Sequence, residues 1–240
     1  MSLRIIVDLT HNEAIEEFPE IELEDIDIEV DYIEAGRISF DDLEDYDVFC
    51  ILNIQHEENR TNDKFTPDEL KAIKRYVGEG GGFLLTSGAG GDRDFSMKQG
   101  SIRVLYKITG VKRFWNGVIQ EATSNFMVKK KNLLVTEFFT HPITKGVTQL
   151  VFPNCTFFTM DEDVDDIIVT SDKADFKYFI DDQINSVGTV PICVASEFHD
   201  GRTVTVGSSD FLLDDSDFGL DAGDNQRFLQ NIINWLTFEI

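Results

Sequence analysis

The glycine-rich stretch at residues 80–92 constrains the fold more than any other part of the chain. Three glycines lead into Phe83-Leu84-Leu85, which has the length and character of a strand buried on both faces, and Thr86–Asp92 supplies small turn residues after it. In an open sheet of parallel strands, such a turn lies at the carboxyl end of its strand, where α/β proteins bind ligands. The stretch therefore predicts an α/β fold with a candidate site at one edge of the sheet.

The residues around this stretch alternate between strand-like and helix-like patterns. Leu3–Leu9 and Tyr46–Asn53 are apolar runs typical of buried parallel strands, whereas Ile26–Ile33 alternates apolar and acidic residues as a half-exposed edge strand does. Thr66-Pro67-Asp68-Glu69 has the N-cap threonine, first-turn proline and reciprocal glutamate of a capping box, which predicts a helix start. We also expect Thr10–Glu13 to open a short helix after the first strand.

The second half of the chain has shorter strand-like segments, at Leu133–Phe138, Cys155–Met160 and Ile167–Thr170. Pro191–Val206 reads as a hairpin because an Asp-Gly turn separates two strand-like runs, and Asp224 suits the N-cap of a final amphipathic helix. The whole pattern predicts a flavodoxin-like three-layer α/β sandwich, with a largely parallel sheet and an antiparallel hairpin extension.

The composition limits the kinds of partner. A chain of 240 residues with 42% hydrophobic residues can bury one sizeable core, and no repeat or low-complexity linker divides it, so we expect a single domain over residues 1–240. The formal net charge of −24 argues against nucleic acid and anionic membrane surfaces, because a phosphate backbone needs a basic footprint. The one dense basic run, Lys129–Lys131, fits a solvated turn.

Two further features predict the cellular setting. Cys50, Cys155 and Cys193 are odd in number and surrounded by apolar residues, as reduced structural thiols are. The apolar run after Arg4 is too short for a secretion signal, and no run approaches the roughly 20 residues of a membrane span. We therefore expect a cytoplasmic protein without membrane insertion; the sequence leaves a homo-oligomer open.

The candidate binding residues are those that follow the predicted parallel strands. Since the carboxyl ends of such strands meet at one edge of the sheet, the polar residues there should form a common rim. The ligand-binding residues expected on this rim are His11, Asn12, Asn53, Thr86, Ser87, Gly88 and Asp210.

Catalytic and metal-binding interpretations of these residues are weaker. Ser87 could act as a nucleophile if His11 served as its base, but nothing in the sequence fixes their geometry. The acidic loop Asp210–Asp224 lacks the spacing of an EF-hand, and no His/Cys cluster has zinc spacing. We expect no metal and no cofactor.

Three stretches carry a resemblance to a known superfamily: Asp68–Asp92, His141–Val147 and Gly201–Leu236. They hold, in order, the helix and glycines before the turn, the run His-Pro-Ile-Thr-Lys-Gly-Val, and the last core strand with the final helix. In these features the chain resembles the class I glutamine amidotransferase-like superfamily. The resemblance is to its non-catalytic branch, which includes the N-terminal domain of an intraflagellar transport complex B subunit, gliding-type transporter accessory proteins and trehalose-utilisation-like proteins.

The resemblance implies a loss of catalysis. The Gly-x-Cys-x-Gly turn of the active members falls on Thr86–Gly90, which places Gly88 at the nucleophile position, and their His-x-Glu pair has no match near Ser208–Asp210. The function implied is a non-enzymatic module, without catalytic residues, that binds a small molecule such as a sugar or serves a protein partner as a scaffold. The alternative is a hydrolase that uses Ser87, if the turn is shifted by one residue.

Overall fold

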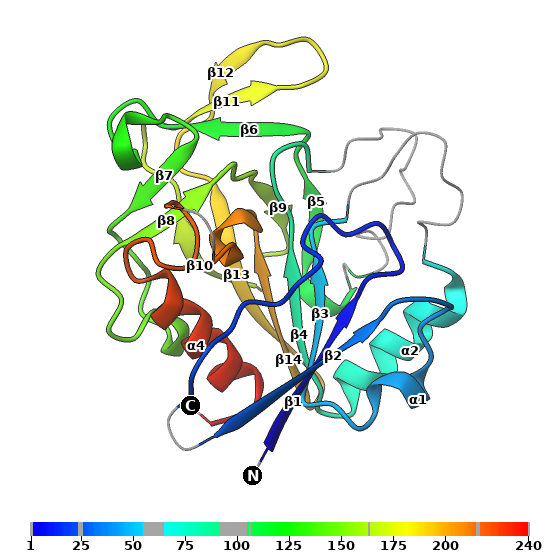
Figure 1. Cartoon of the computed structure of the whole chain (residues 1–240). Coiled ribbons are helices and arrows are strands. Elements are labelled where there is room, and N and C mark those ends of the chain that lie inside the picture. Colours follow the sequence, from blue (N-terminus) through cyan, green and yellow to red (C-terminus); the bar gives the residue numbers. More distant parts are fainter. Residues whose placement is uncertain are drawn as a thin grey trace.

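A seven-stranded sheet forms the centre of the molecule in the computed structural model, which describes residues 2–23, 26–54, 65–91, 105, 107–162, 164–214 and 217–239 (Figure 1). The strand order is β10-β13-β14-β4-β3-β1-β2. The strands of this sheet are β1 (Ser2–Asp8), β2 (Asp27–Ile33), β3 (Val48–Leu52), β4 (Gly82–Thr86), β10 (Asp165–Val169), β13 (Pro191–Phe198) and β14 (Gly201–Val206).

Five neighbouring strands of the sheet run parallel, and a hairpin extends it at one side. β2, β1, β3, β4 and β14 pair in parallel, while β13 pairs antiparallel with both β14 and β10. The expected largely parallel sheet with an antiparallel hairpin extension is therefore confirmed. The edge strand β2 has its acidic residues exposed and its apolar residues half-buried, which also agrees with the alternation in its sequence.

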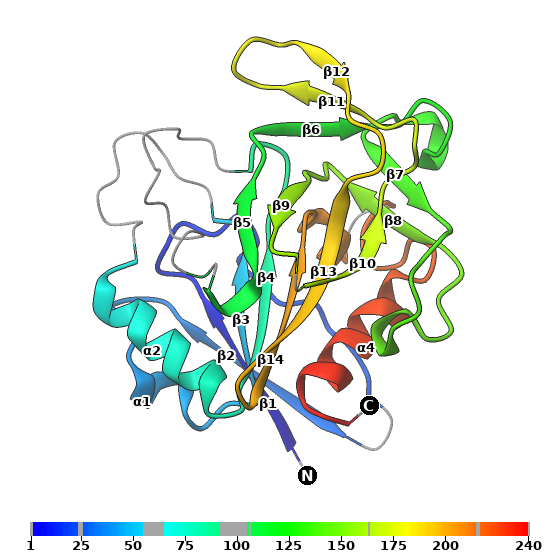
Figure 2. The ribbon, with the colours of Figure 1, turned by 180° about the vertical axis from the view of Figure 1, so that it is seen from behind.

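Helices cover both faces of the sheet, which gives three layers (Figures 1 and 2). The helices α1 (Phe40–Leu43) and α2 (Pro67–Gly78) lie on one face, and α4 (Asn225–Leu236) lies on the other. Alternate residues of β3 enter two separate apolar clusters: Phe49 belongs to the cluster that includes Ile73 of α2, and Cys50 to the one that includes Phe228 of α4. Because both faces of the strand are covered, its sequence is continuously apolar.

The two long helices begin where their N-cap residues predict. Thr66 accepts a hydrogen bond from the Glu69 amide, and the Glu69 carboxylate accepts one from the Thr66 amide, so the capping box is complete. Asp224 is the N-cap residue of α4, but its carboxylate does not cap that helix. It accepts instead from the amide and hydroxyl of Thr148, both at 2.7 Å, and thereby holds the loop before the strand Leu150–Pro153.

Three small sheets and several short turns occupy the second half of the chain. The sheets comprise β5 (Val111–Phe114) with β9 (Phe158–Met160), β7 (Asn132–Val135) with β8 (Leu150–Pro153), and β6 (Gly117–Gln120) with β11 (Asp175–Tyr178) and β12 (Ile184–Ser186). Short 3-10 turns are η2 (Phe126–Val128), η3 (Pro142–Thr144) and η4 (Asp210–Leu212). The sequence pattern predicted β7 and β9 in part, but not β5, β6, β8, β11 and β12.

The expected helix at Thr10–Glu13 is wrong. Asn12 has a left-handed backbone with φ of 61°, and the His11 amide donates to the Glu13 carboxylate instead of to a helical carbonyl. The next amide, of Ala14, donates to the Asn53 carbonyl at the end of β3. This segment is therefore an extended connection tied to β3, because side-chain and long-range acceptors replace those that a helix would provide.

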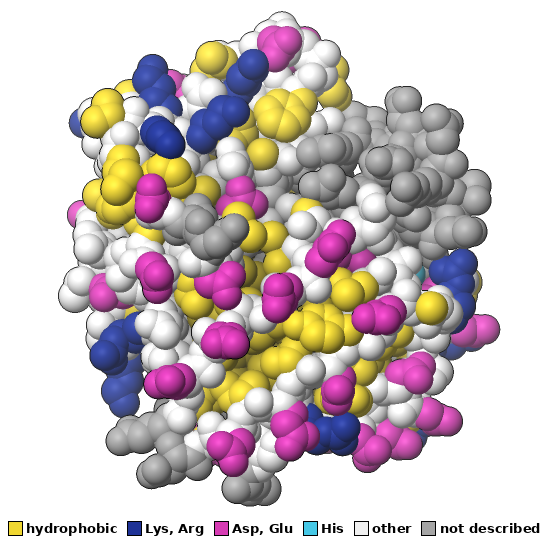
Figure 3. All heavy atoms as spheres, in the orientation of Figure 1, with side chains coloured by type: hydrophobic (Ala, Val, Ile, Leu, Met, Phe, Trp, Pro, Cys, Tyr) yellow, Lys and Arg dark blue, Asp and Glu magenta, His cyan; other side chains and the backbone are white. Residues whose placement is uncertain are grey.

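The surface reflects the acidic composition. Acidic side chains are spread over the face seen in Figure 3, and a band of hydrophobic side chains lies between them. No helix in the described part of the chain is long and apolar enough to cross a bilayer.

Candidate functional site

The carboxyl ends of three adjacent strands meet at one rim. Past the end of β3, the Asn53 amide donates to the Thr86 carbonyl at 3.1 Å, and past the end of β4, the Ser87 amide donates to the Val206 carbonyl at 2.9 Å. These bonds continue the parallel pairing by one residue and fix the residues that follow each strand. The expected meeting of Asn53, Thr86, Ser87 and the residues after β14 is therefore observed.

A hydrogen-bonded row of polar side chains runs across this rim. The Asn53 side-chain amide donates to Ser209 Oγ at 2.8 Å, and the Ser209 hydroxyl is 3.3 Å from Asp210 Oδ1. Asp210 Oδ2 accepts from the Asn154 side chain at 2.7 Å. Ser209 lies within the Ser208–Asp210 segment expected on the rim, whereas Asn154 comes from the loop after β8 and no sequence signal marked it as a rim residue. The row joins three loops, so each polar group is held by a neighbour from another part of the chain.

Gly88 lies directly against this row. A Cβ atom at position 88 would be 2.9 Å from Asn53 Nδ2 and 3.4 Å from Ser209 Oγ, which is too close without displacement of Asn53. A nucleophilic side chain at position 88 therefore has no room beside the observed Asn53 conformation. The neighbouring Ser87 is only 6% exposed.

His11 lies in a different, fully buried cluster and does not pair with Ser87. Its Nδ1 is 2.6 Å from Asp8 Oδ2, its Nε2 is 3.4 Å from Glu69 Oε1, and its ring stacks on Phe65 with a centroid distance of 3.7 Å. Both ring nitrogens face carboxylates, so neither faces a serine. The arrangement gives no support to a Ser87–His11 nucleophile pair.

The elements around His11 explain why it is held so firmly. Asp8 is the last residue of β1, and the Thr10 hydroxyl donates to Asp8 Oδ1 at 2.8 Å. Glu69 belongs to the capping box of α2, and its carboxylate also accepts from the Ile38 amide at 3.2 Å. The sequence identified Glu69 as a capping residue but gave no sign that the same carboxylate approaches His11.

The pKa values of two carboxyl groups in the cluster are shifted in opposite directions. Burial alone would raise the pKa of Asp8, but the hydrogen bond and charge of His11, together with the donors of Thr10, lower it below its ordinary value. Burial, followed by the negative charge of Asp8, raises the pKa of Glu13 to about 9. At neutral pH Glu13 therefore holds a proton while Asp8 is ionised.

The cluster has the residue types of a metal site, and two of its buried atoms, His11 Nε2 and Glu13 Oε1, have no hydrogen-bond partner among the described residues. Asp8, His11 and Glu13 bring one ligand atom each within 4.8 Å of one another, and among the described residues no other group of three does so. A cation would have to displace both the 2.6 Å contact between Asp8 and His11 and the proton of Glu13. We therefore keep the expectation that this cluster binds no metal.

The remaining expected residues differ in their exposure. Asn12 is half-buried beside His11, in the left-handed conformation already described, and Thr86 is buried with a hydroxyl that has no hydrogen-bond partner among the described residues. Asp92 and Asp215, which belong to the turn and the acidic loop considered above, lie outside the described residues. All three cysteines are buried and free, and burial raises the pKa of each thiol.

Comparisons with solved structures bear on the fold. The mmIFT52 N-terminal domain is similar with a TM-score of 0.72 and 17% identity, over 98% of this chain and 97% of that one. A cytoplasmic protein from Salmonella typhimurium LT2 has a TM-score of 0.56 and 18% identity, over 98% and 99% of the two chains. A putative thua-like protein from Bacteroides uniformis ATCC 8492 has a TM-score of 0.53 and 16% identity, over 98% and 91%.

The sequence comparisons decide the family. A search of curated protein sequences gives no match. The similar solved structures share the expected architecture but are too distant in sequence to say more than that. The profile of the ThuA family, described as trehalose utilisation, matches residues 8–218, which include the end of β1, the turn after β4 and the row of polar residues on the rim. The chain therefore belongs to the ThuA family.

Proposed function

We propose that this protein is a non-catalytic binding module whose ligand, a sugar or a similar polyol, lies against the rim formed by Asn53, Ser87, Gly88 and Asp210. The observation that carries the proposal is the close approach of the Asn53 side-chain amide, which donates to Ser209, to the place that a Cβ atom of residue 88 would take. The buried backbone of Gly88, without a side chain, therefore adjoins a row of fixed polar groups.

The chemistry of the rim suits a ligand rich in hydroxyl groups. Amide, hydroxyl and carboxylate side chains together offer both donors and acceptors, which is what each hydroxyl of a sugar requires. Asn53 and Asp210 are half-buried, so part of each side chain remains accessible while hydrogen bonds to Ser209 and Asn154 fix its position. Groups held in this way lose little conformational freedom on binding. The family description, trehalose utilisation, agrees with a ligand of this class.

The absence of a nucleophile–base pair supports a non-catalytic role. Position 88 is glycine and is crowded by Asn53, while both ring nitrogens of His11 face carboxylates. His11, the base considered for Ser87, is held by Asp8 and Glu69, so no observation favours the hydrolase. A scaffold role remains a form of the same proposal, in which a protein partner covers the rim. Because the three thiols are free, we also propose that the protein works in the reducing cytoplasm.

Isothermal titration calorimetry with trehalose, glucose and glycerol tests the proposal. We expect a saturable signal with trehalose that Asn53→Gly weakens at least tenfold, because the substitution removes the amide but tolerates the left-handed backbone of Asn53, with φ of 61°. His199→Gly is the matched control, since His199 has a φ of 54° and is exposed in the β13–β14 turn. Absence of binding by the folded wild-type protein, or equal loss in both variants, would contradict the sugar site.

A further inference from the structure

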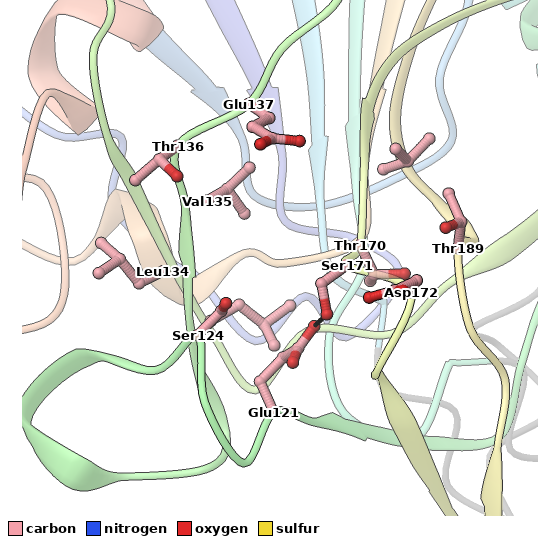
Figure 4. Close-up of a pocket in the computed structure, with 12 residues that line it drawn as sticks. Glu121, Ser124, Leu134, Val135, Thr136, Glu137, Thr170, Ser171, Asp172 and Thr189 are labelled. Atoms are coloured by element: carbon pink, nitrogen blue, oxygen red, sulfur yellow. Dashed lines mark hydrogen bonds between the residues drawn. The ribbon is translucent and has the colours of Figure 1, made fainter.

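A second cleft lies outside the rim, between β7 and the segment that joins β10 to β11. Its volume is about 410 Å³, and it is lined by acidic and hydroxyl side chains together with an apolar wall that includes Leu133, Val135 and Val169 (Figure 4). Glu121 and Ser171 lie together at one end of the cleft in Figure 4, and Glu137 lies at the other. None of these residues takes part in the rim described above.

Glu121 is the unusual residue of this cleft. It is only 2% exposed, and one of its oxygens, Oε1, accepts a hydrogen bond from the Ser171 hydroxyl at 2.7 Å. The other oxygen, Oε2, is buried and has no hydrogen-bond partner among the described residues. A buried carboxylate oxygen without a donor is costly, so the cleft holds an acceptor whose partner would have to come from outside the chain.

The charges around the cleft indicate what kind of donor would fit. Glu137 and Asp172 also line it, and the described lining residues include no Lys, Arg or His. Three carboxyl groups therefore face one hollow without a basic side chain among them. A cationic donor would satisfy Glu121 Oε2 and would gain from the other two carboxyls as well.

The arrangement favours an organic cation over a metal ion. Ca²⁺ takes six to eight oxygen ligands gathered at short distances. The carboxyls of the cleft are not gathered in this way, because the described residues bring three potential ligand atoms within 4.8 Å only at Asp8, His11 and Glu13. The apolar wall beside Glu121 also suits hydrocarbon better than a hydrated ion.

We propose that this cleft binds a small alkylammonium ligand, with its ammonium group at Glu121 Oε2 and its hydrocarbon chain along the wall formed by Leu133, Val135 and Val169. A diamine places its second ammonium group near Glu137 at the other end of the cleft. The ligand neutralises the buried carboxylate that the protein leaves partly unpaired.

Calorimetric titration with 1,4-diaminobutane tests this site, with butylamine as the monoamine and 1,4-butanediol as the neutral analogue, at constant ionic strength. We expect saturable binding of both amines and none of the diol. Glu121→Gln should weaken both amines at least tenfold, because it removes the charge but keeps a side chain of the same shape beside Ser171. Glu34→Gln is the matched control, since Glu34 is exposed after β2 and loses the same charge without any effect on the cleft.

Two further measurements separate a ligand site from a structural carboxylate. Glu137 is exposed, so Glu137→Gln should fold normally; it should weaken diaminobutane about threefold and leave butylamine unchanged. Without ligand, Glu121→Gln should melt at the same temperature as the wild type or higher, because it removes a partly unpaired buried charge. Binding of the diol as tightly as the diamine, unchanged amine binding in Glu121→Gln, or tight binding of Ca²⁺ in place of the amines would each overturn the proposal.

Discussion

The protein contains two buried acidic regions that differ in how many donors the chain supplies, although Glu13 Oε1 in the first lacks a hydrogen-bond partner among the described residues, as Glu121 Oε2 does in the second. At the end of β1, His11 stands between Asp8 and Glu69, and Thr10 and Ile38 supply further donors. In the cleft beside β6, Glu121 has a single donor, Ser171, and one oxygen without any among the described residues.

The difference shows how carboxylate side chains at two places can serve two purposes, one structural and one in binding. A carboxylate surrounded by donors from its own chain fixes that chain, because loss of any donor leaves a buried charge behind. A carboxylate with a free oxygen beside an open hollow contributes less to the fold and is available to a ligand. The sealed region should therefore respond to mutation through stability, and the open region through binding.

The largest expected effect is that of His11→Asn on stability. The substitution leaves Asp8 and Glu69 buried without the ring between them and removes the stacking on Phe65. We expect the free energy of unfolding to fall by about 3–5 kcal/mol, the cost of breaking a buried charge network. Urea denaturation followed by circular dichroism measures this. His199→Asn, in an exposed turn, should change the free energy of unfolding by less than about 0.5 kcal/mol. Similar losses in the two variants would show that the buried cluster contributes no more to stability than an exposed histidine.

A smaller effect should appear in the pH dependence of stability. The pKa of Glu13 is raised from 4.5 to about 9, so the folded protein keeps a proton that the unfolded chain releases within that interval. The contribution of Glu13 is complete below pH 4.5 and is lost as the pH rises toward 9, at up to about 1.4 kcal/mol per pH unit.

Glu13→Gln should remove this dependence, since glutamine does not titrate. Between pH 6.5 and 8, the unfolding free energy of the wild type should fall by about 2 kcal/mol relative to that of the variant. Urea titrations at four pH values in this interval provide the measurement, with Glu34→Gln as the control in which an exposed carboxyl group is replaced by an amide. Parallel curves for wild type and Glu13→Gln would mean that Glu13 is already ionised in the folded protein.

The smallest expected effect is that of salt on the melting temperature. It should distinguish buried charges, which salt does not screen, from exposed charges, which it does. With a formal net charge of −24, surface carboxylates repel one another, and 0.5 M NaCl should raise the melting temperature by about 2–4 °C, the equivalent of about 1 kcal/mol. The stability difference between wild type and His11→Asn should not change, because solvent ions do not reach a fully buried cluster. Differential scanning calorimetry at low and high salt tests both statements; a salt-dependent difference would show that the cluster is open to solvent.

The parallel part of the fold was predictable because its signals are local. Continuous apolar runs mark β1, β3 and β4, and the capping box at Thr66 marks the start of α2. The small sheets were not predictable in the same way. β6 and β11 are four residues long and pair Gly117 with Tyr178, so each becomes a strand only through a partner distant in the sequence.

The candidate sites also divide into one that the sequence predicts and others that it does not. The rim could be inferred because parallel strands must end on the same side, which brings Asn53 and Ser87 together without further information. The position of His11 could not, since the Asn12 backbone and the Glu13 carboxylate replace the expected helix and turn the ring toward Glu69. Glu121 carries no local motif at all; only its burial beside Ser171 sets it apart.

The close approach of the Asn53 side chain to Gly88 has a consequence for substitutions at position 88. A cysteine introduced at position 88 would place its Cβ 2.9 Å from Asn53 Nδ2, so it could be accommodated only if the Asn53 side chain moved. A change at Asn53 alone breaks the hydrogen bond to Ser209 and gives no reactive group in return. A side chain at position 88 is therefore coupled to the conformation of Asn53 and, through it, to the hydrogen bond with Ser209.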